Sequence, residues 1–151
     1  MSKTVADVMT ANPSTVTRLA TATDAAKIML EQDIGSIPVV DGGQLIGIVT
    51  DRDIALRVVA EGRDPTATHV AEIATPEPRA ADPGETLEFA YERMAAWRVR
   101  RLPVVEGERL VGMLSQADLV HELKDKKAGQ LVDEISQPGQ TPYGSKEVGL
   151  D

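Results

Sequence analysis

The chain has 151 residues but no cysteine, one tryptophan, one phenylalanine and two tyrosines. Without cysteine, disulfide bonds and thiolate metal sites are excluded. So few aromatic side chains argue against a platform on which single-stranded nucleic acid would stack. No apolar run approaches the roughly 20 residues that cross a bilayer, and the first residues lack the apolar stretch of a secretory signal. We therefore expect a cytoplasmic protein without membrane contact.

Basic residues are also in short supply, with 16 lysines and arginines against 24 aspartates and glutamates, which gives a net charge of −8. A negative surface disfavours nucleic-acid backbones and anionic membranes as partners. The one basic cluster, Arg98-Val-Arg-Arg101, is too small for a duplex footprint but large enough for one phosphate group. The composition therefore predicts neither a nucleic-acid partner nor a membrane partner.

What the chain does contain is an internal repeat, with a constant offset of 65 residues and no gap. The aligned segments and residues are Val5–Thr10 with Val70–Thr75, Thr21 with Thr86, Ile37–Val40 with Leu102–Val105, Gly47 with Gly112, and Asp53 with Asp118. The repeat divides the chain into a first motif over 1–65, a second over 66–127, and an extension over 128–151. The proline and glycine content of this extension predicts a partly flexible tail.

Each copy has the same order of expected elements, strand–helix–strand–strand–helix. Thr21 and Thr86 are suited to cap the first helix of each copy, and a last helix is expected to begin at Thr50 or Ser115. The strands between these helices are joined through 41–43 and 106–108, where glycine favours tight hairpins. We predict a mixed α/β (α+β) fold in which two β-α-β-β-α units pack about a pseudo-twofold axis, with their sheet faces buried against each other.

The order of motifs in each copy resembles a known family. An Asp-Val-Met-Thr-like start, Ile/Leu-Pro-Val-Val, a hairpin and then Gly-h-h-Ser/Thr-x-x-Asp, occurring twice in register, resembles a pair of cystathionine β-synthase (CBS) domains. The resemblance covers about residues 4–125, and no catalytic domain is attached. The chain is thus similar to the stand-alone CBS-pair proteins of bacteria, including the hypoxic-response type of actinobacteria.

This resemblance implies a regulatory module that binds an adenosyl ligand, namely AMP, ADP, ATP or S-adenosylmethionine, in clefts between the two repeats. It implies no required cofactor. It also implies a disc-shaped antiparallel homodimer and a protein target that the sequence does not identify. Which of these ligands is bound, and whether both clefts are used, stays open.

Thr50 and Asp53, which recur as Ser115 and Asp118, have two interpretations. A threonine at the N-cap with an acidic residue three positions later is close to a capping box. Alternatively, the carboxylate accepts hydrogen bonds from both ribose hydroxyls, while the helix start holds the neighbouring phosphate. We take aspartate to be short for reaching back to the cap, and its presence at both places favours ligand binding. The resemblance implies the same roles for these four residues.

Arg100 and Arg101 directly precede the second Leu-Pro-Val-Val segment. In adenylate-binding relatives a basic pair at this place contacts phosphates, and charge-assisted hydrogen bonds of this kind contribute roughly 1.5–3 kcal/mol each. The first-repeat equivalents, Gly35 and Ser36, carry no charge, so Arg52 is expected to supply the cation there. We therefore predict that the cleft of the second repeat binds phosphates better.

The resemblance also implies an adenine site, whose contacts are expected from Val16, Ile37, Ala81 and Leu102, with Thr10 and Thr15 contributing from across the cleft. Backbone groups near Val16 and Ala81 would read the edge of the base. For each residue alone, a place in the ordinary core is an equally good explanation.

Three functions compete as interpretations of the sequence: a ligand sensor, a structural or protein-interaction module with non-functional clefts, and an enzyme. No phosphate-binding loop or nucleophile with an activating partner is present, so an enzyme is not predicted. His69 and His121 lie far apart without evident co-ligands, so no metal site is predicted. The sensor is the favoured hypothesis, and the interaction module is the alternative.

Overall fold

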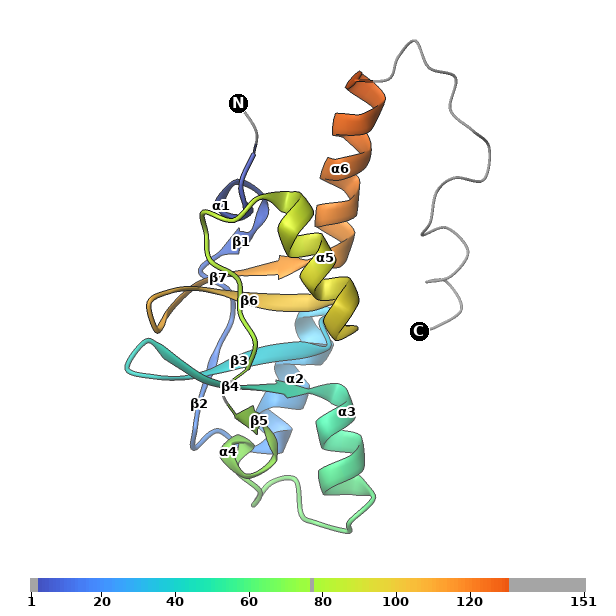
Figure 1. Ribbon diagram of the computed structural model, residues 1–151. Helices are drawn as coiled ribbons and strands as arrows, with labels where there is room; N and C mark the ends of the chain where they lie inside the picture. Colours follow the sequence, from blue (N-terminus) through green and yellow to red (C-terminus); the bar gives the residue numbers. More distant parts are fainter. Residues whose placement is uncertain (1–2, 77, 131–151) are drawn as a thin grey trace.

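The structure is a computed structural model that describes residues 3–76 and 78–130; the end of the predicted C-terminal extension, from residue 131 onward, lies outside the described residues. Its elements follow the predicted order in both repeats (Figure 1). In the first repeat they are α1 Val5–Val8, β1 Thr10–Ala11, β2 Val16–Thr17, α2 Ala22–Gln32, β3 Ser36–Asp41, β4 Gln44–Thr50, α3 Asp51–Ile54 and the π-helical segment η1 Ala55–Val59. In the second they are α4 Val70–Ile73, β5 Thr75–Pro76, α5 Leu87–Trp97, β6 Arg101–Glu106, β7 Arg109–Ser115 and α6 Gln116–Gln130.

The helices begin at the predicted caps. The hydroxyl oxygen of Thr21 accepts a hydrogen bond from the Asp24 amide at 3.1 Å, and that of Thr86 accepts one from the Phe89 amide at 3.2 Å. Each bond satisfies one of the amides that a helix start leaves without a partner. The caps fix the register of α2 and α5, whose buried residues lie on one face of each helix.

The two hairpins share their irregularities as well as their lengths. Gly42, Gly43 and Gly107 lie at the hairpin turns with φ angles of 60°, 85° and 68°, a conformation that glycine adopts without steric cost. The register of the strand pairs shifts between Val39 and Val40, and again between Val104 and Val105. The repeat is therefore reproduced down to the β-bulge.

The leading segments of the two repeats are exchanged. β1 of the first repeat pairs with β7 of the second, with Thr10 opposite Met113. β5 of the second repeat pairs with β4 of the first, with Thr75 opposite Ile48. The helices before these strands are exchanged as well, because the Val5 amide of α1 donates to the Glu85 carbonyl of the second repeat at 3.0 Å. At the equivalent place, the Val70 amide donates to the Ala20 carbonyl at 2.8 Å.

Apolar side chains gather in two separate clusters, one for each hairpin and its helices. Val70 and Ile73 of α4 complete the first cluster, while Val5 of α1 completes the second. The expectation that the two sheet faces bury each other is therefore wrong. The hairpins meet at an edge instead, where Gln44 lies opposite Arg109. The exchanged helices explain the difference, because each supplies the apolar residues that its partner repeat lacks.

α6 is 15 residues long and packs beside α5, with the Lys126 ammonium 2.8 Å from a Glu88 carboxylate oxygen. Within residues 3–76 and 78–130, no helix has both the length and the apolar character needed to cross a membrane. The layout leaves the starts of α3 and α6 at equivalent ends of the two hairpins (Figure 1).

Candidate ligand-binding site

The start of α6 brings together the predicted residues of the second repeat. Arg101 lies directly opposite Ser115 in the β6–β7 ladder. The Gln116 amide donates to the Arg100 carbonyl at 2.8 Å, and the Asp118 amide donates to Ser115 Oγ at 3.1 Å. Two arginines, a hydroxyl and a carboxylate therefore occupy one end of the hairpin, as the sequence predicted.

Thr10 joins this group from the other repeat. It lies on β1 opposite Met113, two positions before Ser115 along β7. The exchange of leading strands thus places a first-repeat hydroxyl residue beside the second-repeat helix start. Thr15 is exposed and comes one residue before β2, so it lies on the connection that leaves this site. The grouping supports a site built from both repeats.

The equivalent end of the first hairpin has a different chemical character. Thr50 lies opposite Ser36, and the Asp51 amide donates to the Gly35 carbonyl at 2.9 Å. Arg52 is exposed on the first turn of α3, between two aspartates. This group has one arginine and two carboxylates, whereas the second repeat has two arginines and one aspartate. Simple Coulomb attraction therefore favours a phosphate at the second site.

Asp53 does reach back to the helix cap, contrary to our expectation. Its Oδ2 accepts a hydrogen bond from the Thr50 amide at 2.9 Å, while its own amide donates to Thr50 Oγ1 at 3.0 Å. Thr21 and Asp24 form the same reciprocal pair. The short side chain suffices because side chains in a helix point toward its N-terminus.

Capping does not use up the carboxylate of Asp53, because a carboxylate offers about four acceptor positions on two oxygens. Asp53 is half-buried, whereas Asp118 is exposed. The capping interpretation is thus correct for Asp53, and it is compatible with a second role toward a ligand.

The four residues expected around adenine are core residues. Val16 and Ile37 belong to the first apolar cluster, and Ala81 and Leu102 belong to the second. The amide and carbonyl of Ala81 are both paired with β6, through Pro103 at 2.8 Å and Val105 at 2.9 Å. The Ala81 amide, which we expected to read the base, is therefore already used in the strand pairing. The core interpretation accounts for these four side chains.

Two residues that were not predicted as ligand contacts lie at the first-repeat site. Thr75 on β5 is the equivalent of Thr10, and the alignment of the repeats alone would have identified it. Ser36 has no charge and so drew no attention, but its Oγ is buried without a hydrogen-bond partner within the described ranges. Buried hydroxyls are rarely left unpaired. A polar ligand atom beside Thr50 would satisfy it.

Within the part of the chain that the structure describes, no group of three or more His, Asp or Glu side chains is placed to hold a metal ion. The His69 Nδ1 atom lies 2.9 Å from the Leu19 carbonyl oxygen. The His121 Nε2 atom lies 3.4 Å from Asp125 Oδ2. Each histidine ring therefore has a local partner, a backbone carbonyl for His69 and a carboxylate for His121.

Comparison with known proteins identifies relatives along most of the chain. The CBS domain family model matches residues 5–60 and 70–125. The CBS domain-containing protein YhcV of Bacillus subtilis is 41% identical over 133 residues, which cover 87% of this chain and 94% of that protein. Hypoxic response protein 1 of Mycobacterium tuberculosis is 35% identical over 136 residues, covering 89% and 95%.

Two solved structures show what related folds contain. A crystal structure of Hypoxic Response Protein I with two coordinated zinc ions matches with a TM-score of 0.73 at 35% identity, over 79% of this chain and 98% of that one. The structure of CBSX2 in complex with AMP matches with a TM-score of 0.71 at 26% identity, over 83% and 98%. With both repeats matched by the family model and relatives similar along nearly their full length, the chain belongs to the CBS domain family as a tandem CBS pair.

Proposed function

We propose that this CBS pair is a regulatory sensor that binds an adenosyl ligand between its two repeats. The observation that carries the proposal is the position of Thr10, on a strand of the first repeat that pairs with β7 beside Ser115. A ligand at this place contacts both repeats at once. The AMP complex of CBSX2, a similar fold, supports the choice of ligand class.

Each side chain at the second-repeat site has a chemical role toward such a ligand. The Asp118 carboxylate accepts hydrogen bonds from the two ribose hydroxyls. The Ser115 hydroxyl, at the positive end of the α6 dipole, donates to the first phosphate. Arg100 and Arg101 contribute charge-assisted hydrogen bonds to the phosphates. Because ribose and phosphate are adjacent in a nucleotide, one helix start serves both.

The first-repeat site, formed by Thr50, Arg52, Asp53, Ser36 and Thr75, is the weaker of the two. The carboxylates of Asp51 and Asp53 repel a phosphate there, and that of Asp53 already caps α3. We expect it to bind uncharged or positively charged parts of adenosyl ligands better than phosphates. Of the ligand class, S-adenosylmethionine meets that description.

The regulatory action follows from the shared site. A ligand shifts a conformational equilibrium only by its different affinity for the two states. A ligand that contacts Thr10 and Asp118 together favours the state in which the exchanged strand is docked on β7. In the cytoplasm, such a shift would alter affinity for a protein target, and no catalytic step is involved.

A homodimer completes the proposal. Four large apolar side chains are exposed on α2, η1 and α5: Leu30 at 83%, Leu56 at 47%, Val59 at 69% and Phe89 at 50%. We propose that these side chains are covered in a contact between two copies of the chain. Sedimentation velocity should give twice the 16.2 kDa mass of the chain, and a monomer at all concentrations would contradict this part.

Calorimetric titration of the protein with AMP, ATP and S-adenosylmethionine tests the ligand proposal. Asp118→Ala removes the acceptor of the charge-assisted hydrogen bonds to the ribose. The variant should therefore bind AMP at least about tenfold more weakly than the wild type. Glu61→Ala, which removes an exposed carboxylate in the turn after η1, is the control and should bind like the wild type. Unchanged AMP binding by Asp118→Ala would show that the site is misplaced.

The exposed helices also support a second candidate, a protein-interaction module whose clefts bind no nucleotide. The same titration separates the two functions. No heat of binding from any of the three ligands at millimolar concentration, together with a stable dimer, would favour the interaction module over the sensor.

A further inference from the structure

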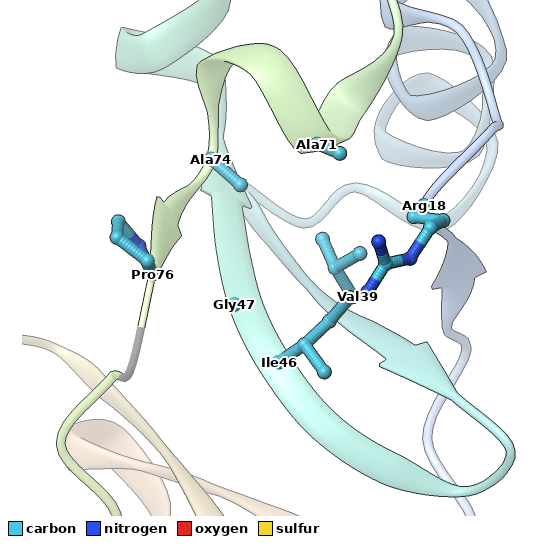
Figure 2. Close-up of a pocket in the computed structure, with 7 residues that line it drawn as sticks. All are labelled: Arg18, Val39, Ile46, Gly47, Ala71, Ala74 and Pro76. Atoms are coloured by element: carbon cyan, nitrogen blue, oxygen red, sulfur yellow. The ribbon is translucent and has the colours of Figure 1, made fainter.

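A hollow of about 210 Å³ lies between the first-repeat sheet and the leading helix of the second repeat, and none of the residues assigned to the two candidate ligand sites lines it. Figure 2 shows Ala71 and Ala74 directed from α4 and its end toward the sheet. The opposite wall is Val39 of β3 with Ile46 of β4, and Pro76 of β5 closes one side. Apart from that of Arg18 at its edge, the side chains that line the hollow are apolar.

In the second repeat, a methionine side chain occupies the place that corresponds to this hollow. Ala74 aligns with Met9, and Gly47 aligns with Gly112. Met9 fills the space over Gly112, with its sulfur where a Cβ on that glycine would lie. Over Gly47 the nearest side-chain atom is the Ala74 Cβ, at 3.5 Å from the equivalent position. The first repeat thus has the equivalent glycine, Gly47, but has Ala74 in place of the methionine that fills the space over it in the second repeat.

A cation occurs at the edge of the open hollow and not at its filled equivalent. Arg18 aligns with Pro83. Its guanidinium lies beside Val39 in Figure 2, with one nitrogen 3.3 Å from Asp41 Oδ2. Both side chains of this ion pair are more than half exposed, at 52% and 61%, so the pair is weak. A guanidinium has five donors, and several are therefore available to a second anion.

The size and charge of the site restrict the ligand. The hollow corresponds to about seven waters at roughly 30 Å³ each, which is small for a nucleotide and adequate for a short aliphatic chain. The Arg18 guanidinium matches a carboxylate in planar geometry. Asp41 is close enough to repel a second negative charge, so a singly charged head is preferred to a phosphate dianion.

We propose that this hollow binds a short branched aliphatic carboxylate, with its head on Arg18 and its tail between Val39, Ile46 and Ala74. The ligand fills the volume that Met9 fills in the other repeat. It also fastens α4 and β5, which belong to the second repeat in sequence, to the sheet of the first.

Methyl NMR titration of the full chain with isovalerate tests the proposal. The methyl signals of Val39 and Ile46 should shift and saturate at millimolar isovalerate. The neutral amide, isovaleramide, should bind at least tenfold more weakly because it lacks the charge. Ala74→Met should abolish the shifts by filling the hollow, and Arg18→Gln should weaken isovalerate binding at least fivefold. Lys124→Gln, which removes an exposed cation on α6, should leave it unchanged.

Ala74→Met is a mild substitution, because Ala74 and Met9 have nearly the same backbone angles, φ −72°, ψ 156° and φ −66°, ψ 158°. The variant should keep its affinity for AMP, which reports that the chain is folded and that the other sites are intact. The proposal is overturned if isovalerate gives no saturable shift, if Ala74→Met binds it as the wild type does, or if the amide binds equally well. Binding of isobutyl phosphate in place of isovalerate would overturn the carboxylate assignment.

Discussion

Thr10 of the first repeat lies opposite Met113 of the second, in an antiparallel ladder that joins β1 to β7. The reciprocal ladder joins Thr75 to Ile48. Each repeat therefore completes its sheet and its apolar cluster with a segment that the sequence assigns to the other. This relationship has consequences for stability as well as for the candidate ligand sites.

The exchanged segments should make the two repeats fold as one unit. A fragment over 66–130 lacks Val5, which is fully buried in the second cluster, and we expect it not to fold alone. The full chain should unfold in a single transition. Urea unfolding followed by fluorescence of Trp97, in the second repeat, should coincide with unfolding followed by circular dichroism. Two separate transitions, or a folded fragment, would contradict the exchange.

The two candidate carboxylates should differ in their effect on stability. Asp53→Ala removes an acceptor that caps α3 through the Thr50 amide, and loss of a helix cap costs about 1 kcal/mol. Asp118→Ala removes an exposed carboxylate. The hydrogen bond to Ser115 comes from the Asp118 backbone amide, which the substitution keeps. Urea unfolding should therefore show a larger loss of unfolding free energy for Asp53→Ala. Equal losses would show that the two helix starts are capped alike.

Arg93 ties α5 to the segment that crosses between the repeats. It contacts Glu85 Oε2 at 2.5 Å, donates to the Ala80 carbonyl at 2.6 Å and stacks on the Trp97 ring at 4.5 Å. Arg93→Met leaves the Glu85 carboxylate, whose side chain is 15% exposed, without its charged partner. We expect a loss of about 2–3 kcal/mol, below the range for fully buried pairs, and a shift in Trp97 emission.

The matched control for this prediction is Arg79→Met. Arg79 stacks on the same ring at 4.7 Å but is exposed, and an exposed cation–π contact is worth about 0.5–1 kcal/mol. If both substitutions cost the same free energy, the ion pair with Glu85 contributes little.

Stability should fall in acid because hydrogen bonds to the ionised forms lower the pKa of several carboxyl groups below its ordinary value. The amide of His69, with help from the Arg63 guanidinium, lowers the pKa of Glu72. The amide and hydroxyl of Thr21 lower the pKa of Asp24. A depressed pKa gives stability that is present above the ordinary value of the group and is lost as the pH falls through the folded-state value.

Melting temperatures should therefore stay level down to about pH 5 and drop below about pH 4.5, near the ordinary pKa of glutamate. Glu72→Gln should reduce the steepness of the drop. Glu92→Gln, at an exposed position on α5, should have no effect on it. A steepness that Glu72→Gln leaves unchanged would show that its hydrogen bonds do not contribute.

Much of the fold is predictable because it depends on local chemistry. Thr21 caps a helix and Gly107 turns a hairpin through contacts within a few residues, so spacing in the sequence is sufficient to place them. The grouping of Arg101 with Ser115 follows from hairpin register in the same way. The constant offset between the repeats then extends each of these predictions to the second copy.

Other features depend on contacts that no local pattern contains. β1 and β5 are two residues long, and nothing in Thr10-Ala11 indicates which sheet it joins. Whether the residues expected around adenine also contact a ligand is equally hidden, since an apolar residue near a ligand site and a core residue look alike in sequence. The reach of Asp53 depends on the direction of a helical side chain, which spacing alone does not give.

The account depends most on a ligand site shared between the repeats, and a crystal structure of the chain grown with AMP tests it most directly. We predict AMP at the start of α6, with its ribose on the Asp118 carboxylate, its phosphate near Ser115 and Arg101, and Thr10 of the exchanged strand in contact with the nucleotide. AMP bound away from both Thr10 and Asp118, at concentrations that saturate the protein in solution, would contradict the account.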